Sequence, residues 1–374
     1  MHTYHIRPRK EAMYISSKGH NVETIILHNK IYGNQTVRNT INGISVIHYI
    51  GRSKKISDWL ETPLGSIIFK PYYLYLGLKF LYWLRQYLKS NPCDYLLCHN
   101  LISAIIGFWA KPKSTKIIFV MREIYENRKF SKISKLQWPM WRFLSAWMRR
   151  HADFIIYVVP YQYKSMSRAD REKAIYIPNY ADRKTFYESC KRKSKKLRIN
   201  YIGGPRDPKA LELLFRAARR NSAIQVTIHG RWSPPRLAAA LAARYPEVII
   251  TGEYDYDSDS RGLYDQTDIL YCAYDPSRLN GKASAPIKLY EAIITKTPVV
   301  ICQEMEAARL VEEKNIGWVF NFNEPEALEN LIDHICKNRN EILEKESSLA
   351  KIQYDYTWES VVGRLDQIFA KNQP

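Results

Sequence analysis

The segment Ala285-Pro-Ile-Lys-Leu-Tyr-Glu-Ala-Ile-Ile-Thr-Lys-Thr-Pro-Val-Val-Ile301 predicts a loop, a helix and a β-branched strand in succession. The loop that leads into it, residues 282–286, consists mostly of small residues, so the first backbone amides of the helix can approach an anion such as a diphosphate. Lys288 and Glu291 are three residues apart and share one helix face. This places a cation suited to phosphate near a carboxylate suited to ribose hydroxyls. An ordinary loop–helix–strand unit with a solvent-facing ion pair has the same pattern.

The second half of the chain alternates apolar, β-rich runs with helical patterns. The candidate strands are residues 197–202, 224–229, 248–251, 269–273, 299–302 and 318–322. The helical patterns between them are residues 208–220, 234–245, 260–266, 287–294, 307–313 and 325–338. Strands that are apolar throughout and separated by helices predict a parallel, doubly wound α/β sheet.

The first half repeats this rhythm. Its candidate strands are residues 22–27, 44–49, 95–98, 116–120, 154–158 and 174–177. The pattern begins with a helix near Arg7–Ala12, whereas open α/β domains usually begin with a strand. We therefore expect the first strand to be missing or very short. Residues 183–196, rich in Lys, Arg and Ser, are typical of a linker between two domains.

Composition limits the class of protein. A chain of 374 residues predicts two domains, and 46% hydrophobic with 25% charged residues is typical of a soluble globular protein. Six scattered cysteines without Cys-x-x-Cys spacing favour a reducing compartment over a disulfide or zinc framework. Neither a signal peptide nor an apolar run long enough to cross a bilayer is visible, which favours the cytoplasm.

Positive charge is concentrated in the first half. Residues 1–185 contain 30 Lys and Arg against 11 Asp and Glu, whereas residues 201–374 contain 21 against 25. Two stretches, 67–89 and 128–150, combine basic residues with many aromatics. That combination suits an anionic membrane surface, although the aromatics also fit the inward faces of two long helices. A nucleic-acid-binding protein is the alternative, but no nucleic-acid-binding motif accompanies the charge.

Several motifs in order resemble the glycosyltransferase family 4, that is, the glycosyl transferases group 1 of the bacterial surface-polysaccharide type. The matching segments are residues 7–22, Ile177–Asp182 with Phe186, Tyr201–Lys209, Lys288–Val300 and Tyr356–Glu359. The resemblance implies the GT-B fold, in which two Rossmann-like doubly wound domains face a central cleft. It also implies transfer of a sugar from a nucleotide-sugar to a lipid-linked or other saccharide acceptor in capsule or lipopolysaccharide synthesis. The implied reaction is retaining and needs neither a metal ion nor a cofactor.

The expected organisation follows from the same motifs. Residues 1–182 form the acceptor- and membrane-facing domain, residues 183–196 the linker and residues 197–355 the donor-binding domain. Residues 356–374 form a C-terminal helix that packs back toward the first domain. The expected location is the inner face of the cytoplasmic membrane, where the protein is peripherally attached.

The resemblance assigns the donor site residue by residue. Its glycine-rich loop corresponds to Gly203 and Gly204, and its basic residues to Arg206 and Lys209. Ser284 and Ala285 occupy the loop that approaches the diphosphate, followed by Lys288. Glu291 matches the second Glu of the family's paired-glutamate motif, which holds the ribose. Pro286 replaces a glycine, which removes one amide from the anion site. Ala283 stands where the first Glu is usual, and together with the missing first strand it leaves as a further alternative a GT-B-like protein that binds nucleotide-sugars without transferring them.

Two residues of the first half are candidate catalytic residues. Asp94-Tyr-Leu-Leu-Cys-His-Asn100 resembles a strand of the family that ends in histidine, which places His99 at the carboxyl end of a parallel strand. A structural histidine fits the same position. Glu123 ends the next strand and is expected on the acceptor side. The acidic segment Glu253–Asp259 resembles a metal loop but lacks the glycine and distal Glu of a calcium site, so no metal is expected.

Overall fold

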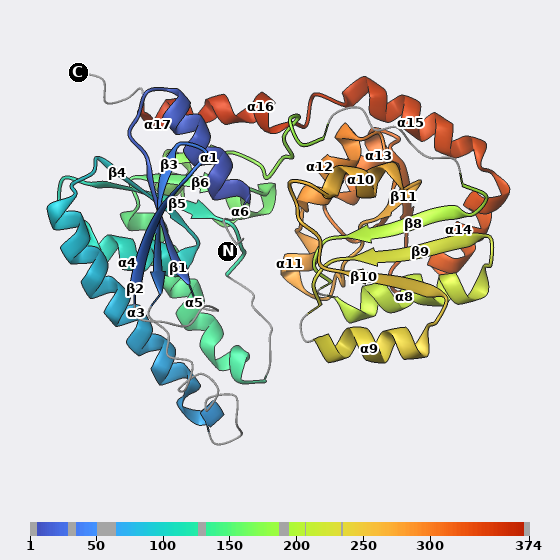
Figure 1. Ribbon diagram of the computed structural model, residues 1–374, viewed down its shortest axis with the longest axis horizontal. Coiled ribbons are helices and arrows are strands. Elements are labelled where there is room, and N and C mark those ends of the chain that lie inside the picture. Colours follow the sequence, from blue (N-terminus) through green and yellow to red (C-terminus); the bar gives the residue numbers. More distant parts are fainter. Residues whose placement is uncertain are drawn as a thin grey trace. The chain divides into compact units, whose positions relative to one another are not determined.

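The computed structural model describes residues 6–28, 35–50, 65–125, 132–186, 194–205, 207–232 and 235–369, with the backbone alone for 65–73, 132–138 and 235–237. The chain divides into two compact units (Figure 1). Unit 1 comprises residues 1–126, 137–177 and 364–374, and unit 2 comprises residues 127–136 and 178–363. The boundaries expected from the sequence, at 182, 196 and 355, remain predictions.

Unit 1 contains two sheets. Its strands are β1 (Glu23–His28), β2 (Gln35–Ile41), β3 (Ile44–Ile50), β4 (Tyr95–His99), β5 (Lys116–Met121), β6 (Phe154–Tyr157) and β7 (Ala174–Tyr176). The first sheet has the order β1-β3-β2, in which β1 is parallel and β2 antiparallel to β3. The second has the order β4-β5-β6-β7 and is parallel throughout.

Helices of 4 to 26 residues accompany the sheets of unit 1. They are α1 (Ile6–Ser17), α3 (Gly65–Ser90), α4 (Leu101–Ala110), α5 (Lys132–His151), α6 (Pro160–Lys164), α7 (Arg168–Arg171) and α17 (Asp366–Phe369). Phe80, Leu84 and Leu88 recur at helical spacing and bury one face of α3 against Tyr49 of β3. The chain returns to unit 1 near its end, where the Phe369 ring contacts Tyr95.

Unit 2 contains one six-stranded parallel sheet with the order β10-β9-β8-β11-β12-β13. Its strands are β8 (Leu197–Ile202), β9 (Ile224–His229), β10 (Val248–Gly252), β11 (Ile269–Tyr271), β12 (Val299–Cys302) and β13 (Gly317–Phe320). Every residue of β8, β11 and β12 is buried, because helices cover both faces. The predicted doubly wound parallel sheet is confirmed.

The helices of unit 2 alternate with these strands. They are α8 (Pro208–Arg220), α9 (Pro235–Arg244), α10 (Ser260–Asp265), α11 (Leu279–Lys282), α12 (Ile287–Ile294), α13 (Ala308–Glu313), α14 (Ala327–Lys337), α15 (Asn340–Ile352), α16 (Trp358–Val361) and the 3-10 turn η1 (Val362–Leu365). Figure 1 shows α8 and α9 on one side of the sheet and α12 and α13 on the other. Asp207 begins α8 by accepting a hydrogen bond from the Ala210 amide, and Pro208 occupies the first helical position.

Within the described part of the chain, no helix combines the length and the apolar character that a bilayer span requires.

Candidate functional site

The sheet of unit 2 contains a topological switch point, because successive strands run outward from β8 on one side and from β11 on the other. Open α/β sheets bind ligands outside the carboxyl ends of the strands at such a point. Gly203 follows β8 with a φ of 122°, in the region that favours glycine, and its amide donates to the His229 carbonyl at 2.9 Å. At Gly230, a Cβ atom would lie 2.1 Å from the Gly203 oxygen. Only glycine lets these two loops approach so closely.

Lys288 projects into this region from the first turn of α12. Its side chain is buried, and its Nζ lies 3.3 Å from the centroid of the Tyr201 ring and 5.1 Å from that of Tyr274. No hydrogen-bond acceptor within the described residues reaches this Nζ. Tyrosine faces attract a cation, but they do not replace the hydrogen bonds that a buried ammonium loses with water. An anionic ligand would supply them.

Glu291 lies one helix turn further along α12 and is also buried, so the alternative of a solvent-facing ion pair is wrong. The phenols of Tyr256 and Tyr264 donate to its two carboxylate oxygens, at 2.7 Å and 2.8 Å respectively. Burial, and after it the Glu291 charge, raise the pKa of each phenol well above its usual value. Both tyrosines therefore remain protonated donors and fix the orientation of the carboxylate.

Phe186, the last residue of the matching segment Ile177–Asp182 with Phe186, supports this arrangement. Phe186 is fully buried, and its ring packs edge-on against Tyr256 and Tyr264 at centroid distances of 5.9 Å and 5.5 Å. The phenylalanine thus holds the two tyrosines that hold Glu291. The sequence analysis placed Phe186 in a segment that resembles the family. It did not predict this contact, because the two tyrosines lie 70 or more residues away along the chain.

Two aspartates, Asp207 and Asp275, connect the loops that follow β8 and β11. Asp207 accepts a hydrogen bond from the Asp275 amide at 2.5 Å, and the exposed Lys209 lies 3.7 Å from the Asp275 carboxylate. Lys209 is therefore at the predicted edge of the sheet but paired with an acid. Gly204 accepts a hydrogen bond from the Tyr201 phenol at 3.3 Å. Arg206 lies outside the described residues.

The loop before α12 is compact. The Ser284 amide donates to the Gly281 carbonyl at 3.2 Å, and Ala285 is half-buried. Pro286 caps α12 in an extended conformation, so the amides of the first turn follow it directly. Ala283 is buried at the end of α11 and carries no polar group. The usual carboxylate of the family is therefore absent from this point of the loop.

His229 is a polar residue of this region that the sequence did not single out. It ends β9, and its Nδ1 lies 2.9 Å from the Thr251 hydroxyl. Burial lowers its pKa to about 4, so the imidazole is neutral near pH 7. Its Nε2 is buried without a hydrogen-bond partner among the described residues.

In unit 1, His99 lies at the carboxyl end of β4, as predicted. Its Nε2 is 3.1 Å from a carboxylate oxygen of Glu11, which is completely buried. Arg7 donates to the other oxygen of Glu11 at 2.8 Å and to the Ile177 carbonyl at 2.9 Å. Burial raises the pKa of Glu11 against the opposing effect of Arg7. The Arg7–Glu11 spacing of four residues on one helix was the available signal for this pair.

Glu123 follows β5 in unit 1. Its backbone carbonyl accepts a hydrogen bond from the side chain of the buried Gln162 at 3.3 Å. Burial lowers the pKa of the neighbouring Arg122, and Arg7 lowers it further, while Glu11 and Glu123 oppose that shift. Glu123 thus belongs to the electrostatic surroundings of the Arg7–Glu11 pair, and its catalytic role remains a prediction.

The acidic segment Glu253–Asp259 forms turns. Asp255 accepts from the Asp257 and Ser258 amides, each at 3.0 Å, and Asp259 accepts from the Asp255 amide at 2.8 Å. Within the ranges that the structure covers, no three His, Cys, Asp or Glu residues are grouped so that they could hold a metal ion.

Comparisons with known proteins agree with this architecture. Residues 196–338 match the family described as glycosyl transferases group 1. A search of curated proteins gave no match. Among solved structures, sucrose-phosphate synthase from Thermosynechococcus elongatus is similar with a TM-score of 0.76 at 15% identity, over 98% of this chain and 92% of that one.

Two further solved structures are similar. WaaG, a glycosyltransferase involved in lipopolysaccharide biosynthesis, gives a TM-score of 0.67 at 15% identity, over 96% of this chain and 94% of that one. HepE from Anabaena in complex with UDP-glucose gives 0.62 at 14% identity, over 78% and 82%. These TM-scores establish a shared fold, GT-B with two Rossmann-like domains, and at these low identities they establish the fold alone.

Proposed function

We propose that this chain is a glycosyltransferase whose unit 2 binds the nucleotide-sugar donor, because residues 196–338 match the glycosyl transferases group 1 family and the chain has the GT-B fold. The sugar is transferred to a saccharide acceptor that unit 1 binds. The reaction is retaining and independent of metal ions. The acceptor is lipid-linked, and the product belongs to a surface polysaccharide.

Lys288 is the observation that carries this proposal. A buried ammonium without a hydrogen-bond acceptor, at the switch point of a doubly wound sheet, fits the diphosphate of the donor. When the bond between sugar and diphosphate breaks, negative charge develops on the leaving group. Lys288 and the first amides of α12 are placed to stabilise that charge, which is the role a metal ion would otherwise have.

Glu291 has the complementary role of binding the ribose. The Tyr256 and Tyr264 phenols each donate to one oxygen of its carboxylate, and an ionised carboxylate is an acceptor group suited to the hydroxyls of a ribose. Tyr256 and Tyr264 hold the carboxylate in one orientation and thereby reduce the entropy lost on binding. Gly203, Gly204, Lys209, Ser284 and Ala285 complete the proposed donor site.

In unit 1, His99 and Glu123 are the proposed catalytic residues on the acceptor side. The departing diphosphate accepts the proton of the acceptor hydroxyl in a retaining reaction, so His99 contacts the sugar or acceptor instead of acting as the base. Glu11 fixes the imidazole, because its carboxylate is buried and is itself held by Arg7.

Attachment to an anionic membrane is also part of the proposal. Helix α3 exposes Leu74, Tyr75 and Leu78, which lie on one side of the helix, and the first half of the chain is strongly basic. These two features together fit an enzyme that acts on a lipid-linked acceptor at the inner face of the cytoplasmic membrane.

Nucleotide binding without transfer is the second candidate, and Ala283 favours it. The family's carboxylate near the transferred sugar is missing there, and the buried alanine leaves no group to take its place at that position. Turnover of a donor distinguishes the two functions.

The donor site can be tested by calorimetry with UDP, GDP and their sugar conjugates, followed by the 2′,3′-dideoxy form of the best nucleotide. Glu291→Gln should reduce the preference for the ribose hydroxyls, and Lys288→Met should weaken binding of the diphosphate but not of the nucleoside. We expect about tenfold in affinity for each, or about 1.4 kcal/mol. Lys351→Met, an exposed lysine of unit 2, is the matched control.

Two results would contradict the assignment. If Glu291→Gln and the native chain discriminate equally between the ribose and dideoxyribose nucleotides, Glu291 does not bind the ribose. Failure of every nucleotide to bind the native chain would refute the donor site altogether. Donor turnover should continue in EDTA, and its abolition by EDTA would refute the metal-independent mechanism.

A further inference from the structure

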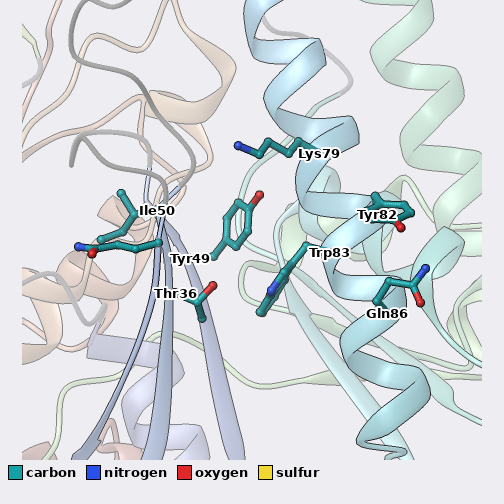
Figure 2. Close-up of a pocket in the computed structure, with 8 residues that line it drawn as sticks. Thr36, Tyr49, Ile50, Lys79, Tyr82, Trp83 and Gln86 are labelled. Atoms are coloured by element: carbon teal, nitrogen blue, oxygen red, sulfur yellow. The ribbon is translucent and has the colours of Figure 1, made fainter.

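Unit 1 contains a cavity of about 420 Å³ between strands β2 and β3 and helix α3 (Figure 2). This volume lies within the range of about 300–1,000 Å³ that is typical of small-molecule sites. The cavity is lined by Gln35, Thr36, Tyr49, Ile50, Lys79, Tyr82, Trp83 and Gln86. From the sequence, Lys79, Tyr82, Trp83 and Gln86 were predicted only as part of the basic and aromatic stretch 67–89, and no residue of the cavity was predicted to bind a sugar.

Two aromatic rings form a wall of this cavity. Tyr49 and Trp83 have ring centroids 4.9 Å apart, and Figure 2 shows both side chains in the space between the strands and α3. Trp83 also stacks on Phe80 and Tyr87, at 5.7 Å and 5.2 Å, so its ring is held by neighbours along the helix. Tyr49 is buried, whereas Trp83 is half-buried and offers part of its surface to a ligand.

Hydrogen-bonding groups surround these rings. Every lining residue except Ile50 carries a polar group, and Lys79 is the one charged residue among the eight. Figure 2 shows the amine of Lys79 extending from α3 toward the strands and the Thr36 side chain beside the aromatic pair. Gln35 and Gln86 add amides, each of which both donates and accepts hydrogen bonds.

This lining matches the chemistry of a sugar ring. The C–H groups on one face of a pyranose form an apolar surface that packs on an aromatic ring, and its hydroxyls each donate and accept hydrogen bonds around the rim. Most of the surface that lines the cavity is apolar, and the residues that add amide and hydroxyl groups, Gln35, Thr36, Tyr82 and Gln86, are exposed. An aromatic wall with a few hydrogen-bonding groups beside it favours a saccharide, since a lipid chain would use only the apolar part of this lining.

The position of the cavity fits a binding site as well. Ile50 ends β3, which is parallel to β1, so the cavity includes the carboxyl end of a parallel strand. Ligands of open α/β sheets lie outside the carboxyl ends of parallel strands, and the edge of the cavity at Ile50 adjoins such an end, although β2 on its other side is antiparallel. We propose that this cavity binds one sugar ring of the acceptor. The proposal rests on the function proposed above, because it gives unit 1 the acceptor.

Saturation-transfer NMR of the full chain with methyl glycosides tests the proposal. The probes are the glycosides of glucose, galactose, mannose, N-acetylglucosamine, N-acetylgalactosamine and glucuronic acid. At least one should bind the native chain, and Trp83→Ala should weaken that binding about tenfold or more. Thr36→Val removes only a hydroxyl from an exposed strand position and should weaken it to a smaller extent. Trp109→Ala, an exposed tryptophan of α4 outside the cavity, is the control and should bind normally.

The proposal is overturned if no glycoside binds the native chain. It is also overturned if Trp83→Ala and Thr36→Val, shown by circular dichroism to be folded, bind the glycoside with the affinity of the native chain. Binding of farnesyl phosphate that depends on Trp83, without binding of any glycoside, would also overturn it in favour of a hydrocarbon site. Nucleotide affinity is measured on the same samples and should not change. If nucleotides fail to bind while a glycoside binds through Trp83, the donor site is refuted and the saccharide cavity stands.

Discussion

Lys288 and Glu291 lie one turn apart on α12, yet each is surrounded by a different pair of tyrosines. Tyr201 and Tyr274 contact the lysine, whereas Tyr256 and Tyr264 hold the glutamate. Helical spacing predicted that the two charges share a face. It could not predict their burial or their tyrosines, because those come from segments 14 to 87 residues away, and in the sequence they resemble ordinary core aromatics.

His229 gives unit 2 a pH dependence of stability. Its pKa in the fold is about 4, whereas an unfolded histidine titrates near 6.5, so the unfolded chain binds more protons between these values. Stability should therefore fall as the pH falls through this window. Between about pH 7.5 and about pH 5 the expected loss from this one group is about 2 kcal/mol.

Urea unfolding of the native chain and of His229→Gln at both pH values measures this effect. The native chain should lose about 2 kcal/mol more on acidification than His229→Gln, because the glutamine does not titrate. His20→Gln, which removes an exposed histidine, should behave like the native chain. Equal pH dependence in all three proteins would show that burial does not depress the pKa of His229.

At the scale of elements, apolar periodicity predicted the central strands well. The predicted strands at 197–202, 224–229 and 299–302 coincide with β8, β9 and β12, because strands buried on both faces are apolar throughout. Strand β2 was not predicted. Its sequence, Gln35-Thr-Val-Arg-Asn-Thr-Ile41, is mostly polar and exposed, and it is strand only because β3 pairs with it along its whole length. The saccharide cavity includes β2 and was therefore not predictable either.

Helix α3 has two faces with different surroundings. Phe80, Leu84 and Leu88 are buried, whereas Leu74 and Leu78 are more than half exposed on an adjoining side. Such exposed aliphatic residues beside Tyr75 are typical of a helix that lies in a membrane interface. We expect Leu74→Ser/Leu78→Ser to weaken binding to anionic vesicles about tenfold or more, since two apolar side chains no longer leave water.

Vesicle flotation with mixed phosphatidylglycerol and phosphatidylcholine tests this helix. The matched control is Leu343→Ser, an equally exposed leucine of α15 in unit 2, which should float like the native chain. Neither substitution touches the lining of the saccharide cavity. If the α3 variant and the α15 variant float equally well, the exposed face of α3 is not the membrane contact.

For the whole molecule, the distribution of charge assigns different partners to the two halves. The formal charge is +20, and the excess of Lys and Arg lies almost entirely in the first half, whereas residues 201–374 contain more acidic than basic residues. An excess of this size attracts polyanions at long range, and salt screens that attraction. The proposed donor site differs, because it holds its charge on the buried Lys288.

Salt should therefore separate the two binding reactions. Raising the salt from about 0.1 M to about 1 M shortens the screening length from about 10 Å to about 3 Å, so vesicle binding that depends on exposed Lys and Arg should weaken by more than tenfold. Nucleotide affinity, which depends on a buried ammonium, should change much less. Flotation at the two salt concentrations, with calorimetry under the same conditions, checks both.

Salt-independent flotation would contradict the electrostatic attachment. If the chain bound double-stranded DNA as strongly as vesicles and did not bind nucleotide-sugars, a nucleic-acid partner for the basic half would be favoured instead.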